Sequence, residues 1–246
     1  MKKPAAIVCV ALLIVLLGSL SASASGLQDG RLEVSGSVSY GSLGISDYYN
    51  DEWLSARLPL VSVSASYHVT PKLSLTADFT FGKGSEVDTE SSSFVVGSCS
   101  HSELNVTGSV ALSDYIRVLA GWTRFASGYT GHLASWYDEE VTNVADGFKL
   151  GAAVSVPLVN RLFLDATYAF VRFLRTQTLV DGDENEAYDG YGHQIEAGLK
   201  YNAGRGLMVT AGFSSHIYQG FSHYAVYETY NLSRLDSGFL RMSYSF

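Results

Sequence analysis

The sequence predicts an all-β protein that folds as one closed antiparallel barrel, and three observations lead to this fold class. Ten segments alternate strictly between apolar and polar residues, which is the period of a strand with two different faces. The connections between these segments alternate between short and long. The apolar face is nearly free of charge in every segment. A closed sheet with an apolar outer face satisfies all three observations, because such a sheet can stand in lipid with every backbone group bonded.

The first five expected strands cover residues 31–40, 60–69, 73–81, 103–112 and 116–123. In the first, apolar residues and Gly36 occupy the even positions from Leu32 to Tyr40, and Glu33 and serines occupy the odd positions. The third and fourth place Asp78 and Glu103 on their polar faces. Tight turns are expected at residues 70–72 and 113–115, where Pro71 and Asp114 favour a turn.

The last five expected strands cover residues 148–156, 162–172, 191–201, 207–215 and 235–246. Turns are expected at residues 157–161 and at the Gly-rich residues 202–206. In the seventh strand the inner face is less polar, so its register is the least strongly specified. In the tenth, Leu240, Met242, Tyr244 and Phe246 share one face, and Arg241 lies on the other.

The lengths of the connections sort by side of the barrel. Connections after the even-numbered strands have three to five residues, and those after the odd-numbered strands have roughly 16 to 23. Transmembrane barrels show this asymmetry, with short turns in the periplasm and long loops outside the cell. Segments of about nine to eleven residues are also long enough for tilted strands to cross a bilayer. A soluble β-sandwich would not sort its loops in this way. An eight-stranded barrel, with one hairpin misassigned, is the internal alternative.

The N-terminus predicts export. Lys2 and Lys3 precede an apolar run at residues 5–17 and a small-residue cleavage site at residues 22–24. We therefore expect residues 1–24 to be a cleaved signal peptide and residues 25–246 to be a single barrel domain, the alternative being a retained membrane anchor. The net charge of −8 argues against a nucleic-acid partner. Cys99 would be the only cysteine of the mature chain, so no disulfide framework is expected.

The C-terminal strand, which ends on Tyr244 and Phe246, resembles the closing strand of bacterial outer-membrane β-barrel proteins. The resemblance implies a place in the outer membrane of a Gram-negative cell, in contact with lipid and lipopolysaccharide. It also implies that Tyr244 and Phe246 form the signal that the outer-membrane assembly machinery reads. A monomer is expected.

The polar faces of the strands bring charged residues into the predicted lumen. They are Glu33, Asp78, Glu103, Asp165 and Glu196, with Arg117, Lys149, Lys200 and Arg241. Buried charges persist only when they are paired, so we expect a network that fills a narrow barrel, with Arg241 paired to a carboxylate such as Glu33. The alternative is a porin-like path that conducts ions or small solutes.

The long loops are acidic, and the fourth contains a candidate cation or ligand site at Asp181, Asp183, Glu184 and Glu186. The segment begins like an EF-hand loop, but Glu186 and Gly192 stand where that motif needs Gly and Glu. We therefore predict no specific metal site and no cofactor.

The ten-stranded layout also resembles the omptins, a family of outer-membrane proteases. That family places an Asp-x-Asp pair in the second long loop and an Asp-Glu-His stretch in the fourth. Here the fourth loop has Asn185 in place of the His, and the second offers only residues 86–88 or 88–90. Asparagine cannot take a proton from water, so the acid–base step lacks its base. The chain is therefore predicted to have no catalytic residues and to be a non-enzymatic barrel with structural, binding or adhesion roles. The alternatives are a narrow channel and an omptin-like protease.

Overall fold

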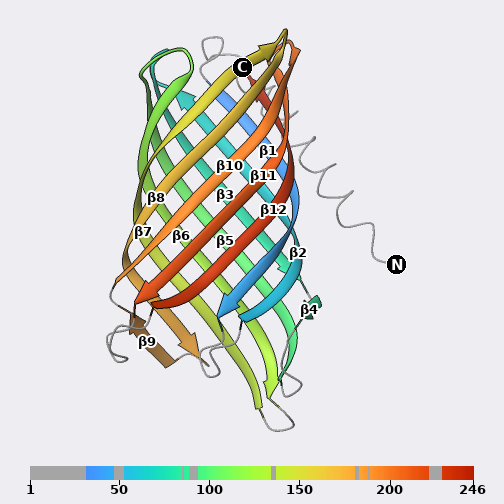
Figure 1. Ribbon diagram of the computed structural model, residues 1–246, viewed down its shortest axis with the longest axis vertical. Coiled ribbons are helices and arrows are strands. Elements are labelled where there is room, and N and C mark those ends of the chain that lie inside the picture. The colour runs from blue at the N-terminus through green and yellow to red at the C-terminus, as the bar shows by residue number, and fades with distance from the viewer. Residues whose placement is uncertain are drawn as a thin grey trace.

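Ten of the twelve strands in the described part of the chain form one closed antiparallel barrel (Figure 1). The computed structural model describes residues 32–46, 53–84, 86–88, 94–133, 137–180, 183–187, 189–221 and 229–246. The barrel strands are β1 (Leu32–Ser46), β2 (Trp53–His68), β3 (Leu73–Gly84), β5 (Phe94–Ala111), β6 (Ile116–Leu133), β7 (Tyr137–Val159), β8 (Leu162–Val180), β10 (Asp189–Gly204), β11 (Leu207–Phe221) and β12 (Thr229–Ser245). Two short strands lie beside the ring: β4 (Glu86–Asp88) pairs with β2, and β9 (Asp183–Ala187) pairs with β8.

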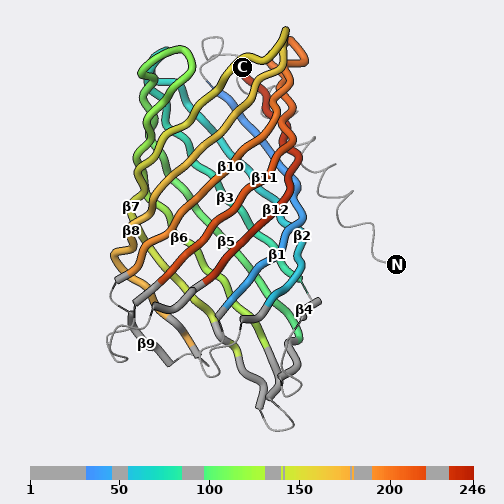
Figure 2. Tube along the Cα trace, viewed as in Figure 1, coloured from blue at the N-terminus to red at the C-terminus, as the bar shows by residue number. Residues whose placement is uncertain are grey.

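The first and last strands close the barrel. Val38 of β1 lies opposite Val61 of β2 on one side and opposite Leu240 of β12 on the other. The Phe246 amide also donates to the Leu32 carbonyl at 2.9 Å, so the end of the chain is fixed against the start of β1. The strands are strongly tilted (Figure 2), as closure of a sheet requires. The predicted closed barrel of ten strands is confirmed, and the eight-stranded alternative is wrong.

The strands continue beyond their predicted ends on the long-loop side. β6 runs to Leu133 and β7 begins at Tyr137, and these two strands stay paired along that whole length. The predicted loop between residues 123 and 148 is therefore mostly a two-stranded hairpin. The alternation used for the prediction requires an apolar outer face and a polar inner face, whereas backbone pairing continues where that pattern is lost and the inner face carries Phe125, Tyr129 and Ala145.

Two of the four turns at the opposite end are tighter than predicted, and the other two are one residue longer. The β2–β3 and β5–β6 connections have four residues each, but β7–β8 and β10–β11 turn in two. Pro157 lies in β7 at a register shift rather than in the turn. Gly204 and Gly206 have φ of 87° and 79°, which explains glycine on both sides of Arg205.

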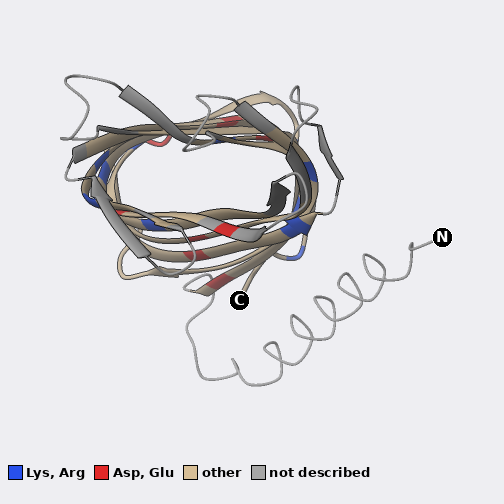
Figure 3. Ribbon diagram, turned by 90° about the horizontal axis from the view of Figure 1, so that it is seen from below, with Lys and Arg blue, Asp and Glu red and all other residues tan. Residues whose placement is uncertain are grey.

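The two faces of the sheet follow the predicted alternation. Leu104, Val106 and Val110 are exposed on the outside of β5, whereas Glu103 and Asn105 are buried inside. In β8, whose register was least strongly specified, Tyr168 and Phe170 are exposed and Ala169 and Val171 are buried, as predicted. Phe173, one residue beyond the predicted strand end, is buried as well. The view along the barrel in Figure 3 shows the ring of strands that encloses this interior. Among the described residues, no helix has the length and apolar character needed to span a membrane.

Candidate functional site

The centre of the lumen is organised around the carboxylate of Glu103, whose side chain is only 1% exposed. Its Oε1 accepts hydrogen bonds from Asn105 Nδ2 at 2.8 Å and from Gln194 Nε2 at 2.9 Å. Its Oε2 accepts from the Tyr218 hydroxyl at 3.0 Å and lies 2.8 Å from His216 Nδ1. Glu103 is on β5, Gln194 on β10, and both His216 and Tyr218 on β11. Since β5 and β11 are five places apart in the ring of ten, these bonds tie opposite walls of the barrel together.

Lys149 is coupled to Glu103 through two side-chain amides. Asn105 and Gln194 each donate an N–H to Glu103 and accept from Lys149 Nζ with their oxygen, at 2.9 and 3.5 Å. The two amides therefore lie between opposite charges with both of their polar ends used. A buried polar network of this kind favours a single arrangement of the interior, because any rearrangement leaves a polar group without a partner.

His101 adds a second imidazole to the Glu103 cluster. Its Nδ1 lies 2.8 Å from Ser127 Oγ, and its Nε2 lies 3.6 Å from Glu103 Oε2 without a hydrogen-bond partner. The His side chain is completely buried. Within the described chain, no group of three or more His, Cys, Asp and Glu residues is arranged to hold a metal ion.

Two apolar clusters fill the lumen on the long-loop side of Glu103, and we call them together the seal. In the first, the Phe125 and Tyr218 rings stack with centroids 4.1 Å apart, and Phe173 meets both rings edge-on. Val171 and Ala145 complete this cluster. The second consists of Leu43, Ile45, Ala56, Leu58, Leu60, Cys99, Tyr129 and Leu235. Every member of the seal is at most 4% exposed, so the outer half of the lumen is packed with side chains.

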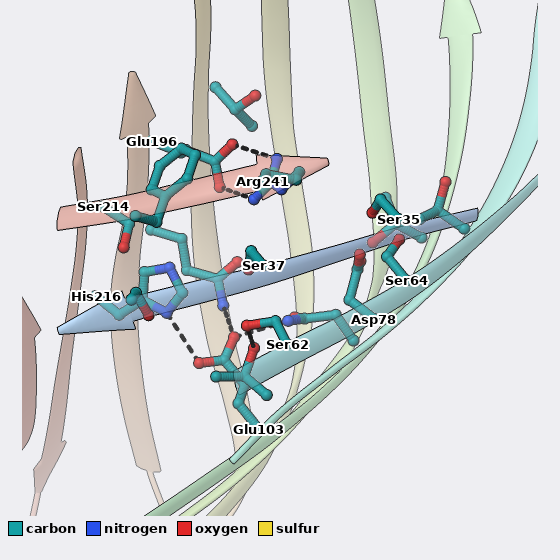
Figure 4. Close-up of a pocket in the computed structure, with 18 of the residues that line it drawn as sticks. Ser35, Ser37, Ser62, Ser64, Asp78, Glu103, Glu196, Ser214, His216 and Arg241 are labelled. Carbon is teal, nitrogen blue, oxygen red and sulfur yellow. Dashed lines mark hydrogen bonds and ion pairs between the residues drawn. The ribbon is translucent and has the colours of Figure 1, made fainter. Parts of the chain in front are cut away.

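On the tight-turn side of the seal the lumen contains two cavities. The first, which we call the central cavity, has a volume of about 300 Å³ and reaches the seal at Leu60 and Leu235. Figure 4 shows that its lining combines the serines Ser35, Ser37, Ser62 and Ser64 of β1 and β2 with the charged or titratable residues Glu103, Glu196, His216 and Arg241. The second, the mouth cavity, has about 710 Å³ and lies at the tight-turn end. Arg117, Glu196 and Arg241 line both cavities.

Four of the remaining predicted lumen charges form two ion pairs, and the others have no charged partner within ion-pair distance among the described residues. Arg241 forms a two-bond ion pair with Glu196, at 2.8 and 2.7 Å, and Lys200 Nζ lies 2.7 Å from Asp165. Among the described residues, the side chain of Arg117 donates to two serines. Asp78 lies opposite Ser64 and lines the central cavity.

The expected partner of Arg241 was wrong. Glu33 is contacted instead by Ser245 Oγ at 3.5 Å. Glu33 lies opposite Ser245 on β12, whereas Arg241 lies opposite Ser37, so the two charges are four residues apart along the seam. Glu196 is two strands away in the ring, but the long Arg side chain reaches across the lumen to it.

Sequence reasoning missed the seal and half of the Glu103 cluster. Four of the missed residues lie beyond the predicted strand ends, in segments predicted to be loops: His101, Phe125, His216 and Tyr218. Each nevertheless has the inward parity of its strand. His101 is two residues before the inward Glu103, and His216 and Tyr218 continue the even-numbered series of Thr210 and Ser214. Continuing the alternation past the apolar segment would have placed all of them in the lumen.

Several predicted residues lie elsewhere. Asp181 and the side chains of Asp183, Glu184 and Glu186 are outside the described residues, although the backbone from Asp183 is extended in β9 and paired with β8. His193 faces outward as its parity predicts, with Nδ1 2.8 Å from the Tyr168 hydroxyl. Tyr244 and Phe246 are in ring contact at the end of the chain, and their role as an insertion signal stays a prediction. The predicted signal peptide, residues 1–24, is likewise outside the described residues.

A family profile for the outer membrane protein beta-barrel domain matches residues 10–202, which is most of the chain. The chain belongs to this family. Its outer-membrane localisation follows, and the tight turns are the periplasmic end of the barrel. A search of curated proteins finds no match.

Solved structures share the fold at low sequence identity. The outer membrane protease OmpT from Escherichia coli is 9% identical, with a TM-score of 0.50 over 90% of this chain and 99% of that one. Neisserial surface protein A is 10% identical, with a TM-score of 0.44 over 87% and 97%. The translocator domain of the autotransporter NalP from Neisseria meningitidis is 11% identical, with a TM-score of 0.45 over 99% and 98%. At these identities the likeness to OmpT concerns the barrel and leaves its function open.

Proposed function

We propose that this protein is a non-enzymatic outer-membrane barrel whose sealed lumen makes a rigid scaffold for its acidic extracellular loops, which carry a binding or adhesion role. The observation that supports this most is the seal. Its first cluster, with Phe125, Phe173 and Tyr218, fills one side of the outer lumen. Its second cluster, which includes Leu43 and Leu60, fills the other side. Eight to ten strands leave an interior just wide enough for side chains to fill, and here large side chains do fill it.

The Glu103 network supports the same function because it holds the seal in place. Tyr218 belongs to both: its ring packs in the seal and its hydroxyl bonds to Glu103 and Gln194. Opening the lumen would therefore require breaking buried charge-assisted hydrogen bonds as well as apolar packing. A barrel braced in this way suits the presentation of loops better than the passage of solutes.

The loops by sequence suit cationic partners, because Asp181, Asp183, Glu184 and Glu186 stand close together. The test measures the affinity of a lysine-rich peptide for the folded wild type and for a variant in which these four acidic residues are changed to Asn or Gln. We expect the variant to bind the peptide more weakly. Equal affinity of the wild type and the variant would show that the acidic residues of the fourth loop do not bind cationic partners.

Planar-bilayer recording tests the sealed lumen. We expect the wild-type protein to give no stable unitary steps. A variant with Phe125, Phe173 and Tyr218 changed to Ala should raise the conductance, whereas Leu240→Ala on the lipid face should not. Regular wild-type steps whose ion selectivity changes in Lys149→Gln or Glu196→Gln would overturn the proposal in favour of a narrow channel. A narrow channel is the second candidate function, and it is favoured by the two cavities on the periplasmic side of the seal, of about 300 and 710 Å³.

The non-enzymatic part of the proposal has its own test. Folded protein in lipopolysaccharide is incubated with dibasic peptides, and we expect no specific cleavage. If the wild type cleaves these peptides and the Asp183→Ala variant does not, the protein is an omptin-like protease instead.

A further inference from the structure

Arg117 is the lumen arginine that has no acidic partner among the described residues. It lies on β6 near the periplasmic end, opposite Ala111 of β5 and Ala153 of β7. Its Nε donates to Ser109 Oγ at 3.2 Å and its Nη2 donates to Ser74 Oγ at 3.1 Å. The two hydroxyls are 2.8 Å apart and so bond to each other. The serine pair therefore takes the place that a carboxylate would occupy beside a guanidinium.

The neighbouring lumen cations are arranged differently. Arg241 and Lys200 each contact a carboxylate at 2.7 Å. Within the described chain, no carboxylate oxygen lies within 4.0 Å of the Arg117 guanidinium. Removing an arginine partly from water without a counter-charge is unfavourable, so this position is improved by any anion that reaches it.

The cavities give an anion access to Arg117. Its side chain lines both the mouth cavity, which is about 710 Å³, and the central cavity. The mouth cavity is lined by more cations than anions: Lys72, Arg117, Lys200 and Arg241 against Asp114, Asp165 and Glu196. This excess is opposite in sign to the net charge of the chain, −8. Once the two ion pairs are set aside, Arg117 and Lys72 remain against Asp114. Lys72 and Asp114 are both on exposed turns, whereas Arg117 is half-buried in the lumen.

The donors at this position match an oxyanion. The Ser74 and Ser109 hydroxyls take one N–H each from Nε and Nη2, so Nη1 and the second N–H of Nη2 have no described partner. One hydroxyl of the serine pair donates to the other, and the second keeps its hydrogen for a ligand. A planar guanidinium beside a hydroxyl donor is suited to two-bond recognition of a phosphate or a carboxylate. We propose that Arg117, with Ser74, Ser109 and Lys72, forms a binding site for a small oxyanion that enters from the periplasm.

Calorimetric titration of the folded full-length protein in detergent micelles tests this site, with inorganic phosphate and acetate as separate ligands in a buffer of low chloride. We expect saturable binding of at least one of them, about one per barrel. Arg117→Gln should weaken it at least about tenfold, because charge-assisted hydrogen bonds are lost. Arg117→Lys keeps the charge and should lose less affinity. Arg205→Gln is the matched control, because it removes a cation from an exposed turn at the same end and should leave binding unchanged.

Heat-modifiable migration in gels shows that each variant is folded. Binding of phosphate alone assigns the site to phosphate groups, and binding of acetate alone assigns it to carboxylates; both support the site. The proposal is overturned if the folded wild type binds neither ligand, or if Arg117→Gln binds as tightly as the wild type. Neither result depends on the seal, so the site and the proposed function can fail separately.

Discussion

The Tyr218 hydroxyl donates to Glu103 at 3.0 Å across the full width of the barrel. The two residues come from β11 and β5, which are opposite each other in the ring. The same Tyr ring stacks on Phe125, so one side chain joins the polar centre of the lumen to the apolar seal. The barrel is thus closed internally by contacts between strands that are not neighbours in the sheet.

Removing the Glu103 carboxylate should destabilise the barrel strongly. Glu103→Ala leaves the donors of Asn105, Gln194 and Tyr218 without their acceptor, and we expect a loss of about 3–5 kcal/mol in the free energy of unfolding. Denaturant unfolding in lipid vesicles measures it. Glu33→Ala is the control, because Glu33 has one described contact, at 3.5 Å, and should lose about 1 kcal/mol or less. Equal losses for the two variants would show that the Glu103 cluster does not stabilise the fold.

A double-mutant cycle tests the partner of Arg241. Because Arg241 and Glu196 share two hydrogen bonds, the losses for Arg241→Gln and Glu196→Gln should be non-additive by roughly 1–3 kcal/mol. The same cycle for Arg241 and Glu33 should give less than about 0.5 kcal/mol. A large coupling in the second cycle and none in the first would contradict the observed pairing. Both cycles use unfolding free energies in vesicles.

The cost of a charge on the outer face should depend on its depth in the membrane. Ile195 is exposed on β10, between Tyr191 and Tyr201. We expect Ile195→Arg to cost about 2–4 kcal/mol and Tyr201→Arg, near the interface, about 0–1 kcal/mol. Unfolding in vesicles would measure both. A similar small cost at both positions would indicate that Ile195 is not in the hydrocarbon region.

Shortening the fourth loop should not unfold the barrel. Replacing residues 177–187 by a short Gly-Ser turn removes β9 and the acidic segment, but keeps Phe173 and Thr176. The seal and the Glu103 network use none of the deleted residues, so heat-modifiable migration should be retained. Loss of this migration would contradict the separation between a rigid barrel and its functional loops.

The alternation of residues was sufficient to predict the barrel and the inward position of its charges. Glu196 and Arg241 were placed in the lumen because a strand has only two faces, and parity assigns each residue to one of them. The same rule holds for His193, which faces outward and bonds to Tyr168. The same parity would also have placed His101, His216 and Tyr218 on the inward face. The sequence, however, contains no signal that shows where strand pairing ends beyond the membrane.

By itself, then, the sequence determined the all-β class, the closed barrel and the side of the sheet on which each residue of a predicted strand lies, because lipid and backbone pairing impose a period of two on every strand. It favoured ten strands and left eight as the alternative. Only the tertiary structure decided which lumen residues meet. Strand tilt and the width of the ring set the partners, so Arg241 reaches Glu196 rather than Glu33, and Tyr218 reaches Glu103. It also decided that Arg117 faces two serines and a cavity, since contacts across a lumen depend on distances that alternation does not encode.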